Sequence, residues 1–242
     1  MLRFENVTLR YGDGPVLAGF DLAIAPGELV VLLGPSGCGK TSLLRLACGL
    51  ARASHGRIAN TFARTAVVFQ EPRLLPWWSA LDNAAFGLAA NGVRTAERRA
   101  RAAALLGRFG FSATDLHKRP PALSGGMQGR VAIARALMVA PDLVLMDEPF
   151  AALDVGLRRD LQDVVRAAVT ETGLAALFVT HDVTEAVRLA DRLVVLSPRP
   201  ARVVHDERTS PVDAPSKIHL AAAALLDRPA VRDALLAATA QV

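Results

Sequence analysis

Short apolar runs recur along the chain, and most of them are not interrupted by polar residues. A strand with one exposed face alternates apolar and polar side chains, so continuous runs indicate strands that are buried on both faces, as in a parallel sheet covered by helices. The runs that fit this description are Leu29–Leu33, Ala66–Phe69, Leu143–Met146, Ala175–Thr180 and Leu193–Leu196. They predict an α/β fold with a parallel core sheet.

The first part of the chain has a different pattern. Leu2–Leu9 and Phe20–Ile24 alternate apolar and polar residues, which is typical of antiparallel strands with one exposed face. Between Phe69 and Leu143 no strand pattern is found, and Ala- and Arg-rich blocks predict helices at Asp82–Asn91, Thr95–Phe109 and Ser124–Val139. We therefore expect an N-terminal antiparallel β subdomain and a helical subdomain inserted at about residues 71–140.

The last part of the chain predicts a helical tail. Prolines punctuate the sequence after His205, and His219–Ala240 is rich in Ala and Leu, as in one or two peripheral helices. We therefore expect one domain at residues 1–205 and a C-terminal helical tail at residues 206–242.

A glycine-rich segment follows the strand Leu29–Leu33 and precedes a helical run, Ser42–Leu50. Its sequence, GPSGCGKT, fits the phosphate-binding pattern G-x-x-x-x-G-K-[ST] in the strand and helix context that the pattern requires. Glycines let backbone N–H groups turn inward around phosphates, and the helix N-terminus adds positive charge. A chance lysine in a glycine-rich turn is disfavoured because the chain has only three lysines. The residues predicted to contact nucleotide here are Gly34, Pro35, Ser36, Gly37, Cys38, Gly39, Lys40, Thr41 and Ser42.

Two adjacent carboxylates end the buried strand at Leu143–Met146. Open α/β sheets bind their ligands at the carboxyl ends of such strands. Asp147 is suited to a Mg²⁺ site and Glu148 to polarising an attacking water. An acid cluster at a helix N-terminus is the alternative, and the nearby phosphate-binding pattern favours the catalytic interpretation.

The segment LSGGM, Leu123–Met127, opens a long apolar-periodic helix with Ser124 in the N-cap position. Its two glycines expose backbone N–H groups, so it is a second anion-binding helix terminus. With this segment the sequence resembles the ABC transporter ATPases, whose signature LSGGQ is LSGGM here. The resemblance extends from Met1 to about Arg202 and implies a P-loop NTPase fold of the RecA-like type.

The resemblance implies further roles, although each of these residues taken singly is more commonly structural. Tyr11 resembles the aromatic residue that stacks on adenine, and Gln70 the Q-loop glutamine that contacts Mg²⁺ and the attacking water. Asp154 resembles the D-loop residue that acts across a dimer, and His181 the switch histidine at the γ-phosphate. The implied catalytic residues are Glu148, His181 and Gln70; the metal ligands are Thr41, Gln70 and Asp147; the signature residues at the nucleotide are Ser124, Gly125, Gly126 and Met127.

Two positions depart from the family pattern. Met127 replaces the signature glutamine, as in importer ATPases of the family. Gly129 stands in the first turns of the helix where the family has a larger polar residue, and a glycine there destabilises a helix by about 0.5–1 kcal/mol relative to alanine. We expect a looser start of this helix.

In the family, two such subunits bind ATP and Mg²⁺ head to tail and drive transmembrane permease subunits, which receive solute from a periplasmic or extracellular solute-binding protein. The segments VFQEPRLLPW, MDEPFAALD and RLADRLVVLSPRP resemble sequences of the ATPases of nitrate, sulfonate and taurine importers and of their thiamine-precursor relatives. The tryptophans of Gln70–Asn83 are either core residues or part of a groove for a permease helix. Alternatives are a non-transport ABC ATPase, another ABC importer class, a P-loop kinase and the ATPase half of an exporter.

Composition raises the question of a membrane span, which the sequence does not support. Hydrophobic residues make up 52% and the mean hydropathy is +0.30, but no uncharged apolar stretch approaches the roughly 20 residues of a spanning helix. The first ten residues lack the apolar segment of a signal peptide. The two cysteines, Cys38 and Cys48, are not expected to form a disulfide. The net charge of +5 comes from scattered basic residues, so we expect no nucleic-acid partner. The family resemblance implies a peripheral location on the cytoplasmic side of the inner membrane.

Overall fold

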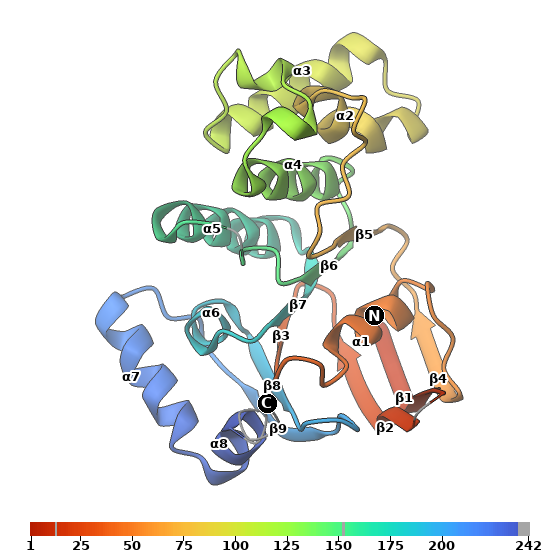
Figure 1. Cartoon of the computed structure of the whole chain (residues 1–242), viewed down its shortest axis with the longest axis vertical. Coiled ribbons are helices and arrows are strands. Elements are labelled where there is room, and N and C mark those ends of the chain that lie inside the picture. The colour runs from red at the N-terminus through yellow and green to blue at the C-terminus, as the bar shows by residue number, and fades with distance from the viewer. Residues whose placement is uncertain (13, 152, 237–242) are drawn as a thin grey trace. The chain divides into compact units, whose positions relative to one another are not determined.

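The computed structural model describes residues 1–12, 14–151 and 153–236. The chain forms two compact units, one made of residues 1–62 and 168–242 and the other of residues 63–167. Figure 1 shows the ribbon of the whole chain.

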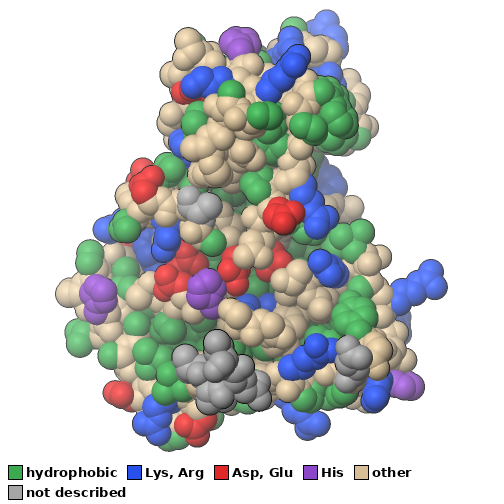
Figure 2. All heavy atoms as spheres, in the orientation of Figure 1, with side chains coloured by type: hydrophobic (Ala, Val, Ile, Leu, Met, Phe, Trp, Pro, Cys, Tyr) green, Lys and Arg blue, Asp and Glu red, His purple; other side chains and the backbone are tan. Residues whose placement is uncertain are grey.

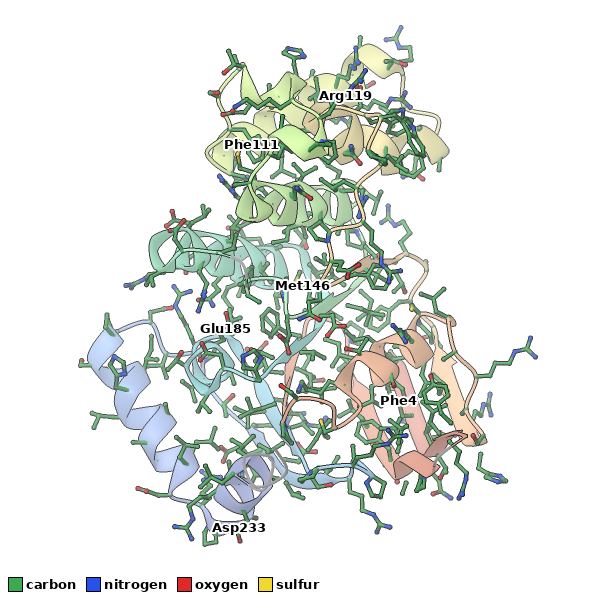
Figure 3. All side chains as sticks on the ribbon, in the orientation of Figure 1. Phe4, Phe111, Arg119, Met146, Glu185 and Asp233 are labelled. Atoms are coloured by element: carbon green, nitrogen blue, oxygen red, sulfur yellow. The ribbon has the colours of Figure 1, made fainter. Side chains whose placement is uncertain are left out.

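The N-terminal strands of the first unit form an antiparallel sheet. Its strands are β1 (Leu2–Tyr11), β2 (Gly14–Ile24) and β4 (His55–Asn60), in the order β2-β1-β4. The rings of Phe4, labelled in Figure 3, and Phe20 meet edge to face with centroids 5.5 Å apart. The sequence pattern predicted β1 and β2 but missed β4, whose exposed residues give no apolar alternation. Gly56 of β4 has φ +84°, and a Cβ there would lie 2.3 Å from the carbonyl oxygen of Asn6.

The same unit holds four strands of a mostly parallel sheet. They are β3 (Leu29–Leu33), β7 (Ala175–Thr180), β8 (Arg192–Leu196) and β9 (Val203–Arg208). Within this unit their order is β7-β3-β8-β9, and only the β8–β9 pair is antiparallel. Every residue of β3 and β7 is buried, which confirms the prediction from their continuous apolar runs.

Strand β9 corrects the predicted start of the tail at residue 206, because Val203–Arg208 crosses that point. The strand pairs with β8 at an edge, and its half-exposed polar residues gave no strand signal. Beyond it, α7 (Pro215–Leu226) and α8 (Pro229–Leu236) are the expected peripheral helices; the predicted end of the tail helix at Ala240 lies outside the described residues. Arg228 fastens the tail to β9 through a hydrogen bond of 2.6 Å to Glu207.

Two further helices of the first unit follow parallel strands. Helix α1 (Lys40–Ala47) comes after β3, and α6 (Val183–Leu189) comes after β7. Asp182 caps α6, because its carboxylate accepts the N–H of Thr184 at 2.7 Å. Helix α5 (Val155–Thr172) begins in the second unit and ends in the first.

The second unit combines a parallel strand pair with the inserted helices. The strands are β5 (Thr65–Val68) and β6 (Leu143–Asp147), and the helices are α2 (Ala80–Ala90), α3 (Thr95–Arg108) and α4 (Gly125–Met138). Short 3-10 turns, η1 (Asp115–His117) and η2 (Pro120–Ala122), lead into α4. The three helices pack on one another (Figure 1). Gly87 of α2 permits this packing, since a Cβ there would lie 2.3 Å from Val139 Cγ1.

These elements confirm the predicted fold class, an α/β protein with parallel strands, an antiparallel β subdomain and an inserted helical signature region. Hydroxyl caps fix the starts of two of the inserted helices. Ser79 accepts the N–H of Asp82 at 3.1 Å, and Ser124 accepts that of Met127 at 3.2 Å, each satisfying a donor that the first turn of a helix leaves unpaired. In the part of the chain that the structure describes, every helix is too short or too polar to cross a membrane.

Candidate functional site

The phosphate-binding loop connects β3 to α1 in the first unit. Gly37 and Gly39 have φ values of +76° and +121°, a region that favours glycine. A Cβ on Gly39 would also lie 2.9 Å from Val16 Cγ1 of β2. The buried ammonium of Lys40 donates to the carbonyls of Gly34 at 2.7 Å and Pro35 at 2.9 Å. The lysine therefore folds back over its own loop at the N-terminus of α1, where helix N–H groups attract anions.

Cys38 contributes to the packing of this loop. Burial raises the pKa of its thiol, although the positive charge of Lys40 acts in the opposite direction. A Cβ on Gly34 would lie 3.1 Å from the Cys38 Sγ and 3.2 Å from the Leu196 Cβ, so the loop begins in a tight space. Both cysteines are free thiols, as predicted.

The loop shares one sheet edge with the end of β7. Leu33 pairs with Thr180 in the parallel register, so Gly34 and His181 leave the sheet side by side. Thr180 donates its hydroxyl to Glu185 of α6, labelled in Figure 3, at 2.7 Å, which fixes the turn that carries His181. The first unit thus brings together two of the predicted elements, the phosphate-binding loop and the histidine.

Tyr11 lies at the end of β1, where it pairs with Gly14 across a turn. Its side chain is 48% exposed. The ring is therefore available for stacking against a planar group. The adenine contact that the sequence predicts for Tyr11 requires an exposed ring of this kind.

The second unit brings Gln70 and Glu148 together at a pocket. Met146, labelled in Figure 3, pairs with Val68 in the parallel register of β5 and β6, so Gln70 and Glu148 follow the two strands at one edge. Both line a pocket of about 320 Å³ whose other walls include Pro72 and the first turns of α4. Asp147, the last residue of β6, is buried.

The backbone of Glu148 is strained. Its φ of +44° lies in the left-handed region that costs a non-glycine residue on the order of 1–3 kcal/mol. Such strain persists only where the surrounding structure holds the residue in place. Here the conformation turns the chain between β6 and Pro149 at the wall of the pocket, so the strain is localised at the residue that the sequence predicts to be catalytic.

The start of α4 forms another wall of this pocket. Ser124 and Gly125 are exposed, and a Cβ on Gly125 would meet no atom within 4 Å. Gly129 also lines the pocket, where a Cβ would lie 3.9 Å from the Pro149 carbonyl oxygen. Gln128 braces this end of the helix, because its amide donates to Pro120 at 3.0 Å and Leu123 at 3.2 Å. These two hydrogen bonds counteract the loss of helix stability expected from Gly129.

Asp154 occupies the N-terminal end of α5. Its carboxylate accepts the N–H of Leu157 at 3.0 Å, which is a helix-capping contact. Its negative charge also acts on Arg130 of α4, where it opposes the lowering of the arginine pKa by burial. Asp154 is exposed.

Sequence reasoning missed two residues that hold the segment between β5 and α2. Arg135 of α4 donates to the carbonyls of Pro72 at 2.8 Å and Arg73 at 2.9 Å. Asn83 of α2 is fully buried and bonds both the N–H and the carbonyl of Leu75. Neither residue belongs to a contiguous motif, and their partners are backbone atoms, so no sequence signal marked them.

The predicted metal ligands do not form a cluster of carboxylates, thiolates or imidazoles. Among the described residues, no group of three or more His, Cys, Asp or Glu side chains could hold a metal ion. The predicted set of Thr41, Gln70 and Asp147 instead offers a hydroxyl, an amide oxygen and one carboxylate. These are hard oxygen donors of the kind that Mg²⁺ accepts when it keeps waters and phosphate oxygens as its other ligands.

Comparison with known proteins decides the family. Residues 17–151 match the family model described as ABC transporter. The chain belongs to the ABC transporter family. Among similar ABC proteins is the taurine import ATP-binding protein TauB of Chromobacterium violaceum, 45% identical over 84% of this chain and 81% of that protein. The aliphatic sulfonates import ATP-binding protein SsuB of Ralstonia nicotianae is 44% identical over 92% of this chain and 77% of that protein.

A solved ABC structure has the same fold. The ATP-binding cassette MJ0796, solved as a dimer in a post-hydrolysis state bound to ADP and Pi, superposes with a TM-score of 0.80. It is 29% identical in sequence, and the match covers 88% of this chain and all of that one. The resemblance to ABC ATPases, and to the subgroup that includes taurine and sulfonate importers, is confirmed by these comparisons.

Proposed function

We propose that this chain is the ATP-binding and hydrolysing subunit of an ABC importer for taurine, aliphatic sulfonates or a related small solute such as nitrate. The names of its relatives TauB and SsuB support the solute class. The observation that carries the assignment of ATP hydrolysis is the pocket in the second unit, which both Glu148 and Gln70 line. The same chain has a phosphate-binding loop whose carbonyl of Gly34 accepts a hydrogen bond from Lys40.

The loop and its helix bind the nucleotide in this proposal. The N–H groups of residues 34–42 surround the phosphates, Lys40 exchanges its two carbonyl partners for phosphate oxygens, and the exposed ring of Tyr11 stacks on adenine. Thr41, Asp147 and Gln70 supply oxygen ligands for Mg²⁺. When bound, the cation neutralises charge that develops on the phosphates during hydrolysis.

Glu148 polarises the attacking water as general base, while Gln70 positions it and His181 contacts the γ-phosphate. The products are ADP and phosphate. The signature residues Ser124, Gly125, Gly126 and Met127, together with Asp154, complete the site of a second copy of this chain. Two observations support this assignment to a second copy: Ser124, Gly125 and Asp154 are exposed, and MJ0796 was solved as a dimer.

Transport requires a surface for permease subunits, and the second unit exposes a suitable apolar one. Trp77 is 63% exposed and Phe86 of α2 is 48% exposed. Trp78 packs edge to face on Phe86 with ring centroids 5.2 Å apart. Figure 2 shows hydrophobic side chains at the surface among basic ones in the part of the molecule that α2 and α3 form. Exposed aromatic clusters of this kind mark protein interfaces.

The partners in this proposal are a second ATPase subunit, in a homodimer, and transmembrane permease subunits that pass solute from a solute-binding protein. The location that follows is the cytoplasmic side of the inner membrane, with the chain attached peripherally through the permease.

The substitution Glu148→Gln tests the catalytic assignment. Glutamine keeps the shape but cannot accept a proton, so hydrolysis should slow by about 10²–10⁴-fold while MgATP binding survives and a closed dimer accumulates. Lys40→Ala should instead lose nucleotide affinity. Phosphate release and size-exclusion chromatography with and without MgATP distinguish the two failures. Hydrolysis by Glu148→Gln at the parental rate would refute the role of Glu148.

A further inference from the structure

The segment between Gln70 and Ser79, here named the strap, connects the pocket of the second unit to its exposed aromatic face. It contains no helix or strand, so regular secondary structure does not satisfy its backbone hydrogen bonds. Gln70 begins the strap at the pocket, and Trp77 lies near its other end. Strand β5 fixes the start of the strap, and the hydrogen bonds along the strap fix the path of the chain that leaves Gln70.

Arg135 of α4 holds the half of the strap nearer to Gln70. Its two terminal nitrogens donate to consecutive carbonyls, those of Pro72 at 2.8 Å and Arg73 at 2.9 Å. This is a forked contact for which a planar guanidinium is suited and a lysine ammonium is not. Arg73 has φ +47°, and its own guanidinium lies over the Phe69 ring, 4.6 Å from the centroid. The contacts of Arg135 and Arg73 thus fix the path of the backbone before and after the forked contact.

A different residue holds the other half of the strap. Asn83 of α2 accepts the Leu75 N–H at 2.8 Å, and its amide nitrogen lies 3.1 Å from the Leu75 carbonyl and 3.0 Å from that of Ser79. The aromatic end of the strap therefore has its own anchor. Removing the Arg135 fork should loosen the Gln70 end and leave Trp78 in place.

We propose that Arg135 is a positioning residue for ATP hydrolysis, which acts by holding Gln70 at the pocket it shares with Glu148. The fork lies two residues from Gln70, and Pro72, one of its acceptors, lines the same pocket. Because α4 also carries the signature residues at its other end, one helix supports both the strap and the signature. The inference rests on the catalytic role of Gln70 stated under Proposed function.

A double-mutant cycle with Arg135→Lys and Gln70→Ala in the full chain tests this proposal, with kcat and KM for ATP as readouts. Arg135→Lys should lower kcat by roughly tenfold to a hundredfold, by no more than Gln70→Ala does, with little change in KM because the phosphate-binding loop is intact. In the Gln70→Ala background, Arg135→Lys should have no further effect. Tryptophan emission should stay at the parental wavelength.

Arg130→Lys is the matched control, because Arg130 is another partly buried arginine of α4 that donates to a backbone carbonyl, that of Phe109. Its effect on kcat should be equal with and without Gln70. Arg135→Met, which keeps the alkyl stem, should reproduce the loss seen with Arg135→Lys.

Three results with the Arg135 variants would overturn the proposal. They are an unchanged kcat in Arg135→Lys, an equal loss from Arg135→Lys in both backgrounds, and failure of both Arg135 variants to fold, which would make the residue structural. A parental kcat in Gln70→Ala would also overturn it, and the Glu148→Gln assay would then show separately whether the proposed function stands.

Discussion

Replacing Asn83 by leucine should strongly destabilise the second unit. Asn83 is fully buried, and its oxygen accepts the Leu75 N–H at 2.8 Å. Its nitrogen lies within 3.3 Å of the carbonyls of Leu75, Trp78 and Ser79. An amide nitrogen carries two hydrogens, so two of these three contacts can be made in full, and the side chain makes about three hydrogen bonds in total.

The expected loss follows from these contacts. At about 1 kcal/mol for each hydrogen bond, the three amount to roughly 3 kcal/mol, and the unpaired N–H of Leu75 adds about 1 kcal/mol or more. Leucine is not smaller than asparagine, so a cavity contributes little. We therefore expect the free energy of unfolding to fall by about 4 kcal/mol or more.

Urea unfolding followed by tryptophan fluorescence measures this loss. Both tryptophans of the chain, Trp77 and Trp78, lie in the strap, so the signal reports the region that Asn83 holds. Asn91→Leu is the control, because Asn91 is exposed at the C-terminal end of α2 and its replacement should change stability by less than about 0.5 kcal/mol. A loss below about 1 kcal/mol in Asn83→Leu would refute the hydrogen-bond reasoning.

Exposure, strain and charge each lead to one further prediction. Trp77→Ala should change stability by less than about 0.5 kcal/mol but reduce recovery of the chain with permease subunits from native membranes; unfolding of this variant would place Trp77 in the core instead. Gly39→Ala should lower the midpoint of thermal unfolding and the affinity for ATP more than Gly37→Ala does, because both positions have positive φ but only Gly39 also has an atom within 3.0 Å of the added Cβ; equal losses would show that crowding by Val16 is unimportant. Hydrogen bonds from Lys118 and Ser112 lower the pKa of the Asp115 carboxyl from its ordinary value of 3.8 to about 2. The stabilisation of the fold by the ionised carboxylate should therefore be complete above pH 3.8 and lost as the pH falls through about 2. An NMR titration in which Lys118→Met leaves the pKa of Asp115 unchanged would contradict the assignment.

Much of the fold was predictable because burial on both faces leaves a simple pattern. The apolar runs at β3, β6 and β7 were predicted within a residue of their observed ends. Strands β4 and β9 were missed because they lie at sheet edges and carry polar or half-exposed residues. At an edge, backbone hydrogen bonding to a neighbouring strand determines the structure, and side-chain pattern contributes less.

Some residues of the candidate site could likewise be predicted from the sequence, and others could not. Contiguous motifs such as the phosphate-binding loop and LSGGM could be found from sequence because their residues act close to one another along the chain. Arg135 could not be found, since its acceptors are backbone carbonyls 62 and 63 residues away and carbonyls have no residue identity. The alternative that both tryptophans are core residues fails for Trp77, which is 63% exposed, whereas Trp78 is half-buried and packs on the exposed ring of Phe86.

The left-handed backbone of Glu148 places conformational strain at the residue proposed as the general base. Glycine at that position would remove strain on the order of 1 kcal/mol or more, but it would also lose the interactions of the Glu148 side chain and raise the conformational entropy of the unfolded chain. A search for more heat-resistant variants that scores folding alone would therefore exert no selection for the proposed general base at this position. Only a screen that also demands phosphate release would keep the glutamate.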